Sequence, residues 1–135
     1  MRLNKVYVST ESGQRLNLLV QRTGLKPNLA CRLGFCLSLE EAGIPTTQEF
    51  GGTGDREFNW STLFGQWDTL FVAMLKQRLV SDGGDPEENL EHQLQLHLNR
   101  GVFLLFKRLR QLEDLGPLLQ HVSTGAPGNS GEVDA

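Results

Sequence analysis

The chain has 135 residues, a formal net charge of −3 and 39% hydrophobic residues. A chain of this length forms one domain with its own core. It has no apolar run long enough to cross a membrane. The N-terminus lacks the apolar segment of a secretory signal peptide, so we expect a cytoplasmic protein.

The charge is distributed unevenly along the chain. Residues 1–36 carry six basic side chains against one acidic side chain, a balance of +5, whereas residues 37–135 have a balance of −8. A basic head on an acidic body binds an anion with one end only. The same basic side chains also suit an ordinary solvated surface, and charge alone does not decide between these interpretations.

The chain begins with a predicted strand. Residues 3–8 are β-branched and aromatic enough for a short one, and its alternation places Lys5 and Tyr7 on one face. A lone strand needs a partner, and the simplest partner is the same strand of a second subunit. We therefore predict a homo-oligomer in which two strands form a ribbon.

Two helices follow the strand. Ser9 or Thr10 caps a first helix over about residues 11–22, and Asn28 caps a second helix that ends before Gly43. The buried face of the second helix is predicted from helical spacing. Its members are Leu29, Leu33, Cys36 and Leu37.

The remaining sequence predicts a helical body. In chain order we expect a loop over 43–57, a short extended segment within 56–62, a helix over 66–80, a helix over 86–98, a break at 99–101 and a helix over 102–115. The 66–80 helix is expected to bury Trp67 and Leu70. The predicted fold is therefore mainly α, with a short N-terminal strand and a ribbon-helix-helix-like N-terminal part (1–42), a helical body (43–115) and a mostly disordered segment (116–135).

Patterns typical of catalysis or metal binding are scarce. His92 and His97 are five residues apart and share no helical face. Cys31 and Cys36 are also five apart, which favours buried thiols in a reducing compartment over a disulfide or a zinc site. We expect no catalytic residue, no cofactor and no metal.

Binding of DNA is better supported. A two-subunit ribbon would present its exposed face to the major groove, the first amides of the second helix would hold a phosphate, and the arginines would add salt-dependent attraction. The predicted DNA contacts are Lys5, Tyr7, Arg15, Arg22, Lys26, Asn28 and Arg32. The later basic cluster is interpreted mainly as a solvated face, with an addition to the anion surface left open. It consists of Lys107, Arg108 and Arg110.

Four blocks of the sequence together resemble DndE, a family of small DNA sulfur modification proteins. They are LNKVYVS at 3–9, TGLKPNLACRLGFCLSLEE at 23–41, REFNWSTLFG at 56–65 and HLNRGV at 97–102. The resemblance covers about residues 1–115. It implies a compact, tetrameric and non-catalytic protein that binds duplex DNA, preferably nicked, through basic surface residues.

The resemblance also implies a pathway and partners. The machinery replaces a non-bridging phosphate oxygen of DNA with sulfur, DndE acts in it with the DndC and DndD proteins, and a cysteine desulfurase supplies the sulfur. The DNA-facing residues that it implies in this chain are Lys5, Arg15, Arg22, Lys26 and Arg32. Two other functions stay open: a ribbon-helix-helix transcriptional regulator or antitoxin, and a structural adaptor whose basic head contacts an acidic protein.

Overall fold

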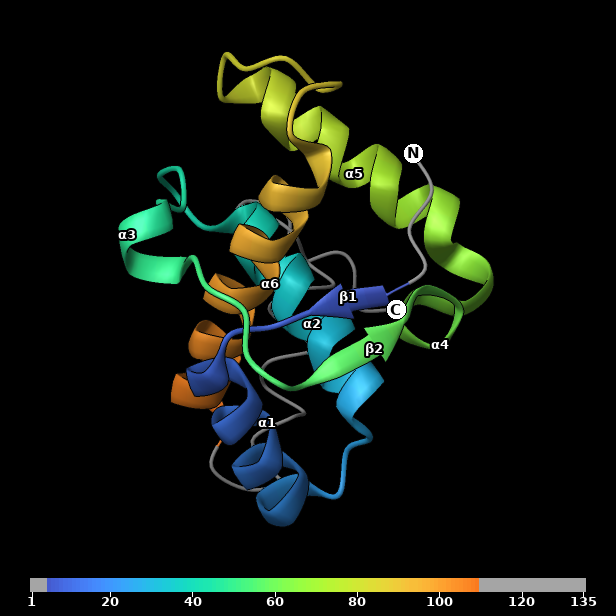
Figure 1. Ribbon diagram of the computed structural model, residues 1–135, viewed down its shortest axis with the longest axis vertical. Helices are drawn as coiled ribbons and strands as arrows, with labels where there is room; N and C mark the ends of the chain where they lie inside the picture. The colour runs from blue at the N-terminus through green and yellow to red at the C-terminus, as the bar shows by residue number, and fades with distance from the viewer. Residues whose placement is uncertain (1–4, 110–135) are drawn as a thin grey trace, which may run out of the picture.

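The computed structural model describes residues 5–109 and is mainly helical, with one short hairpin (Figure 1). Its elements are β1 (Lys5–Tyr7), α1 (Thr10–Thr23), α2 (Pro27–Glu40), α3 (Thr47–Phe50), β2 (Glu57–Asn59), α4 (Trp60–Phe64), the 3-10 turn η1 (Gly65–Trp67), α5 (Asp68–Ser81) and α6 (Leu90–Arg108). The mainly α fold with a short N-terminal strand is confirmed. The predicted tail and Arg110 lie outside the described residues.

The hairpin joins two distant segments of one chain. Strand β1 pairs antiparallel with β2, with Val6 opposite Phe58. On the other edge of β1, the Tyr7 carbonyl accepts a hydrogen bond of 3.2 Å from Gln95 of α6. The prediction that β1 lacks a partner in its own chain is therefore wrong, and with it goes the reason for pairing β1 with a second subunit. The extended segment that the sequence predicts within residues 56–62 contains β2, which is the strand partner of β1.

Helix α1 forms as its sequence predicts. Ser9 is the N-cap, and its hydroxyl accepts a hydrogen bond of 3.1 Å from the Ser12 amide. The helix ends at Gly24, whose φ of 77° is the left-handed conformation that glycine adopts at little cost. Leu16 and Leu19 are fully buried.

The centre of the fold is a close crossing of α2 and α6. A Cβ atom on Gly101 would lie 2.1 Å from the carbonyl oxygen of Gly34, so both positions require glycine. The predicted break at 99–101 is wrong, because α6 runs through it without interruption. Gly101 serves close packing rather than a turn. Around the crossing, the rings of Phe35, Phe64 and Phe71 contact one another in the core.

Helix α2 differs from its prediction at both the cap and the buried face. Lys26 is the N-cap and makes no side-chain capping bond, while the Asn28 amide group donates to the Thr62 carbonyl at 3.2 Å. Only Leu37 of the predicted face is buried, and Leu29 is 40% exposed. The face that packs on α6 and α4 is rotated and contains Ala30, Cys31, Gly34, Phe35, Leu37 and Ser38.

Three further segments depart from expectation. The predicted 43–57 loop contains the short helix α3. Helix α6 begins at Leu90 rather than near 86, after Asn89 in a left-handed conformation with φ 51°. Trp67 and Leu70 are 50% and 52% exposed instead of buried. No helix among residues 5–109 is long and apolar enough to cross a membrane.

Two arginines hold the C-terminal end of α2. Arg100 donates to the Ser38 hydroxyl at 2.9 Å, to the Ser38 carbonyl at 2.7 Å and to the Gly43 carbonyl at 2.9 Å. Arg78 of α5 donates to the Leu39 carbonyl at 2.7 Å and to Gly43. These bonds satisfy carbonyls that the helix end leaves unpaired, and positive charge there suits the helix dipole.

Asn99 fastens the start of α1 to α6. Its side-chain oxygen accepts from the Ser9 amide at 3.0 Å and from the Ser12 hydroxyl at 2.9 Å, and its amide group donates to the Phe50 carbonyl at 2.7 Å. One buried side chain therefore positions β1, α1 and α3 on a single turn of α6. This arrangement fixes α1 beside the C-terminal half of α6.

Candidate nucleic-acid interface

Three cations gather where α1 lies against the end of α6. The guanidinium of Arg15 lies 4.9 Å from the ring centroid of Phe103, and that of Arg22 lies 4.8 Å from the centroid of Phe106. The Lys107 ammonium lies 5.0 Å from the Phe103 centroid. We call Arg15, Arg22 and Lys107 the basic ridge.

The ring contacts orient these cations without neutralising them. Arg15 and Arg22 are two helical turns apart on α1, and Phe103 and Lys107 are one turn apart on α6, so each pair lies on one side of its helix. Arg22 and Lys107 are exposed, and within residues 5–109 none of the three takes part in an ion pair. A cation over an aromatic face keeps its full charge.

Lys26 extends the positive charge towards α2. It is exposed, follows the turn at Gly24 and is the N-cap of α2. The first turn of α2 has no acidic residue and no side-chain cap. Pro27 at the start of the helix has no N–H group. The amides that follow it lie at the positive end of the helix dipole.

Asn28 and Arg32 serve mainly to hold α4. The Arg32 Nε atom donates to the Leu63 carbonyl at 2.6 Å, and its Nη2 atom lies 3.3 Å from the Thr62 carbonyl oxygen. Asn28 donates to the same Thr62 carbonyl. The structure therefore separates these two predicted contacts from the basic ridge and gives both side chains a role in positioning the short helix.

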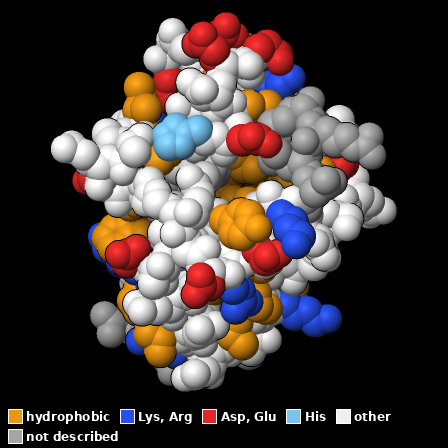
Figure 2. Space-filling view, viewed as in Figure 1, with side chains coloured by type: hydrophobic (Ala, Val, Ile, Leu, Met, Phe, Trp, Pro, Cys, Tyr) orange, Lys and Arg blue, Asp and Glu red, His pale blue; other side chains and the backbone are white. Residues whose placement is uncertain are grey.

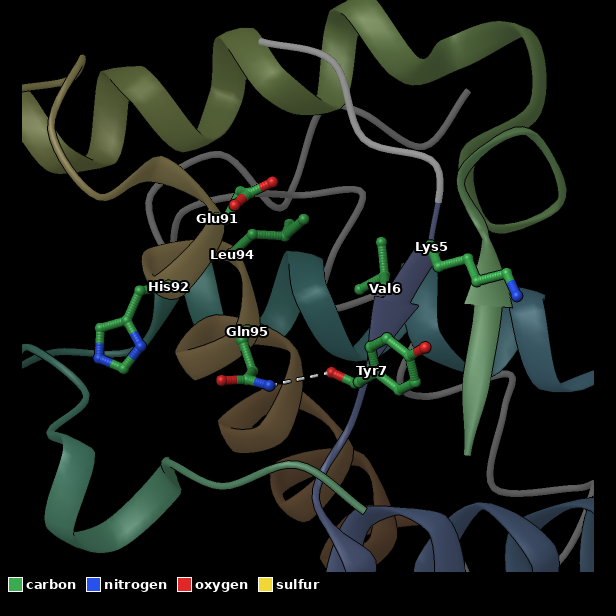
Figure 3. Close-up of a pocket in the computed structure, with 7 residues that line it drawn as sticks. All are labelled: Lys5, Val6, Tyr7, Glu91, His92, Leu94 and Gln95. Carbon is green, nitrogen blue, oxygen red and sulfur yellow. Dashed lines mark hydrogen bonds between the residues drawn. The ribbon is translucent and has the colours of Figure 1, made fainter. Parts of the chain in front are cut away.

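Lys5 and Tyr7 lie on strand β1 of the hairpin (Figure 3), whereas the ridge residues lie on α1 and α6. Lys5 forms an ion pair of 3.1 Å with Glu57, and its hydrogen bond to that carboxylate raises the pKa of Lys5. Tyr7 lines a groove of about 210 Å³ between β1 and the first turns of α6, where His92 and Gln95 form the opposite wall. The Lys5 charge is thus partly offset.

A group of five acidic side chains lies at the end of the molecule opposite α1, and other acidic side chains are spread over the rest of the surface. The five lie in the turn between α5 and α6 and at the start of α6, and this end is red in Figure 2. The residues are Asp82, Asp85, Glu87, Glu88 and Glu91. This acidic group and the ridge lie far apart on the fold, while Glu11 and Glu49 line the same groove as Arg15.

The two thiols are free, and neither is poised for reaction. Cys31 is fully buried, and desolvation raises its pKa to about 12. Burial also raises the pKa of the half-buried Cys36, assisted by the nearby Glu40 carboxylate. The prediction of buried thiols is confirmed for Cys31 and holds in part for Cys36. Among residues 5–109, no three His, Cys, Asp or Glu side chains are grouped as metal ligands.

The sequence analysis left Lys107 undecided, and the structure assigns it to the ridge. The sequence does contain a sign of this placement. Phe103 and Lys107 are four residues apart and therefore lie on one side of the helix, and Arg108 follows in the last turn. What the sequence did not show is that α1 packs beside this turn, so that Arg15 and Lys107 share one ring.

Comparisons with known proteins agree with this architecture. The crystal structure of DndE from Escherichia coli B7A, described as involved in DNA phosphorothioation modification, matches with a TM-score of 0.64 and 23% sequence identity, over 78% of this chain and 98% of that chain. No curated protein matches the chain by sequence. The sequence profile described as "DNA sulphur modification protein DndE" matches residues 5–112. The chain therefore belongs to the DndE family.

Proposed function

We propose that this protein is a non-catalytic, DNA-binding subunit of the DNA sulfur modification machinery. Membership of the DndE family supports the pathway, and the similar Escherichia coli protein is described as acting in phosphorothioation. The DndC and DndD proteins are the proposed partners, with a cysteine desulfurase as the source of sulfur. A homo-oligomer, expected to be a tetramer, and a preference for nicked duplex complete the proposal.

The basic ridge is the observation that carries this proposal. It places exposed cations from two helices on one surface at the end opposite the acidic turn. Point charges of this kind attract backbone phosphates and carry little sequence information. The ridge therefore suits recognition of duplex shape or a nick better than recognition of an operator.

The transcriptional-regulator alternative loses its basis in the structure. It required two β1 strands from different subunits to form a ribbon that presents Lys5 and Tyr7. Strand β1 instead pairs with β2, and the Tyr7 carbonyl is bonded to Gln95. The strand partner that this alternative sought in a second subunit is thus supplied within the chain.

A charge-reversal experiment tests the ridge. The variant Arg22→Glu with Lys107→Glu removes one cation from each helix of the ridge. The matched control is Lys76→Glu, at the ion pair with Glu87 away from the ridge, and it is compared with the single variant Lys107→Glu, which changes the net charge equally. Binding to intact and nicked duplexes is measured by fluorescence anisotropy over a range of salt concentrations.

We expect the ridge variant to bind more weakly and to show a shallower salt dependence. Each lost phosphate contact reduces the slope of log K against log[salt] by about 0.9, so two contacts reduce it by roughly 2. The control is expected to keep the wild-type slope. Equal losses in Lys107→Glu and in Lys76→Glu would show that net charge, rather than the ridge, governs binding. No binding by the wild-type protein would refute the DNA-binding function.

A further inference from the structure

A groove of about 410 Å³ opens beside the basic ridge, between α1, α3 and α6. Its volume lies within the roughly 300–1,000 Å³ range of small-molecule sites in proteins. Arg15 of the ridge lines the groove, together with Glu11 of the same helix. Glu49 and Phe50 of α3 and Phe103 of α6 line it as well. The groove therefore brings a guanidinium, two carboxylates and two phenyl rings to one space of ligand size.

The floor of the groove is rigid, and its polar groups are already paired. Asn99, which is 2% exposed, accepts from the Ser9 amide at 3.0 Å and from the Ser12 hydroxyl at 2.9 Å. Its amide group donates to the Phe50 carbonyl at 2.7 Å, which ties α3 to α6. A supporting side chain held in this way keeps a binding site in shape before the ligand arrives. Polar recognition of a ligand is therefore left to the side chains at the rim.

The rim offers acceptors on two carboxylates and donors on one guanidinium. Glu11 and Glu49 are exposed, and among residues 5–109 neither they nor Arg15 form an ion pair. Glu49 accepts a long hydrogen bond of 3.4 Å from the Thr46 hydroxyl, which involves one of its two oxygens. An ionised carboxylate can only accept hydrogen bonds, and a guanidinium can only donate them. A ligand that pairs with both therefore carries N–H donors on one edge and acceptors on another.

We propose that this groove binds an unpaired guanine base. Guanine presents its N1–H and N2–H₂ donors side by side, and a carboxylate accepts such a pair with its two oxygens. Its O6 and N7 atoms are acceptors, and arginine donates to them in the commonest specific contact between proteins and bases. Adenine and cytosine have one amino donor next to acceptors, and thymine has one ring N–H. In a duplex the donor edge of guanine is paired with cytosine, so the groove takes a base that has left the stack.

The phenyl rings complete a site for a flat base. The centroids of Phe50 and Phe103 lie 6.0 Å apart, and the ring planes are inclined at 48°. Arg15 and Lys107 lie over the Phe103 ring, whereas no cation of the described residues lies over Phe50, which is partly exposed. Phe50 is therefore the ring against which the base packs, and such contact adds affinity for any base. The choice of guanine depends on Glu11, Glu49 and Arg15.

Two sources supply an unpaired guanine, and they are tested separately. The first is a DNA strand held on the basic ridge, and this form of the inference rests on the proposed function. The second is a free guanine nucleotide, which binds whether or not the protein binds DNA. Saturation-transfer NMR with guanosine, inosine and adenosine monophosphates tests the free nucleotide, because inosine lacks only the N2 amino group of guanosine.

Fluorescence anisotropy with bulged duplexes tests the DNA source. The duplexes differ in one unpaired base, which is guanine, hypoxanthine or thymine, and hypoxanthine again lacks the N2 amino group. We expect the wild type to prefer the guanine bulge to the hypoxanthine bulge by at least about fivefold. This ratio cancels the affinity for backbone phosphates, which is common to all the duplexes.

The decisive variant is Glu11→Gln with Glu49→Gln, which removes both carboxylates from the groove. Its matched control is Glu88→Gln with Glu91→Gln, which makes the same change of charge at exposed residues of the acidic turn and the start of α6. The preference for guanine over hypoxanthine is expected to fall to about 1 in the groove variant and to persist in the control.

Each outcome decides both the guanine site and its source. A preference for guanine among the duplexes assigns DNA as the source. A preference for guanosine over inosine monophosphate, without binding of any duplex, assigns the free nucleotide and refutes the proposed function. Equal binding of guanine and hypoxanthine by the wild type in both experiments, or an unchanged preference in the groove variant, would overturn the guanine site. Salt-dependent binding of all the duplexes would in that case leave the proposed function standing.

Discussion

The buried histidine of α6 makes the stability of this protein depend on pH. The His97 side chain is fully buried, and its Nδ1 atom lies 2.8 Å from the Ser38 hydroxyl. The same hydroxyl accepts from the Arg100 Nε atom at 2.9 Å, and the Nε2 atom of His97 is buried without a hydrogen-bond partner among the described residues. Burial, with the charges of Arg100 and Arg78, lowers the pKa of His97 from 6.5 to about 4.

The direction and the size of the pH effect on stability follow from the lowered pKa of His97. The folded-state pKa lies below that of the unfolded chain, so between about pH 6.5 and pH 4 the unfolded chain binds a proton that the folded protein does not. The contribution of neutral His97 to stability is complete above pH 6.5 and is lost as the pH falls towards 4. At about 1.4 kcal/mol per pKa unit, the loss is about 3 kcal/mol.

Urea unfolding at several pH values between 7 and 4 measures this loss. The comparison is between the wild type and His97→Asn, which lacks the titrating ring; the difference between the two curves removes the contribution of the carboxylates. We expect the wild type to lose about 3 kcal/mol more than the variant over this range. Should the variant be too unstable at pH 7, an NMR titration of His97 in the wild type gives the pKa directly. Parallel unfolding curves, or a His97 pKa near 6.5, would refute the reasoning.

Two other predictions concern the core. Gly101→Ala places a Cβ atom 2.1 Å from the Gly34 carbonyl oxygen and should destabilise the fold by about 1–3 kcal/mol or more, whereas Gly84→Ala, whose nearest neighbour lies 3.6 Å away, should be close to neutral in chemical denaturation. A thiol reagent should modify Cys36 in the native protein and reach Cys31 only on unfolding, because Cys31 is buried with a pKa of about 12; equal rates for both thiols would contradict this placement.

The sequence predicted the elements that depend on local chemistry. Ser9 followed by an amphipathic stretch specified α1, and alternating β-branched residues specified β1. It failed where a tertiary contact overrides the local pattern. Gly101 was interpreted as a break because glycine weakens helices, but Gly34 on another helix requires it there.

The buried faces were the least predictable feature. Trp67 and Leu70 were assigned to the core because large apolar side chains are usually buried. A rule that counts apolar residues cannot predict that these two side chains are exposed. Leu29 was misplaced in the same way. Helical spacing finds an apolar stripe, but on a helix with two apolar sides it does not say which side packs within the chain.

Only part of the candidate interface could be predicted from the sequence, again because the packing of the helices was unknown. Arg15 and Arg22 were predicted as DNA contacts from the uneven charge and from the resemblance, and the structure brings them to one side of α1. Arg32 was assigned to the same surface because the sequence does not show that the Leu63 carbonyl lies within reach of its guanidinium. Lys107 entered the site only when the packing of α1 on α6 was known.

The sequence blocks that carry the family resemblance and the residues of the basic ridge have different roles in the molecule. The block His97–Val102 holds the fold together, because Arg100 and Asn99 fasten the end of α2 and the start of α1 to α6. These roles need particular donors at fixed distances. The basic ridge lies outside all four recognisable blocks, and the contact with phosphates proposed for it requires only exposed positive charge. Recognition of the family through its packing residues therefore fixes the architecture, and it leaves the proposed DNA contact of the ridge to be tested by experiment.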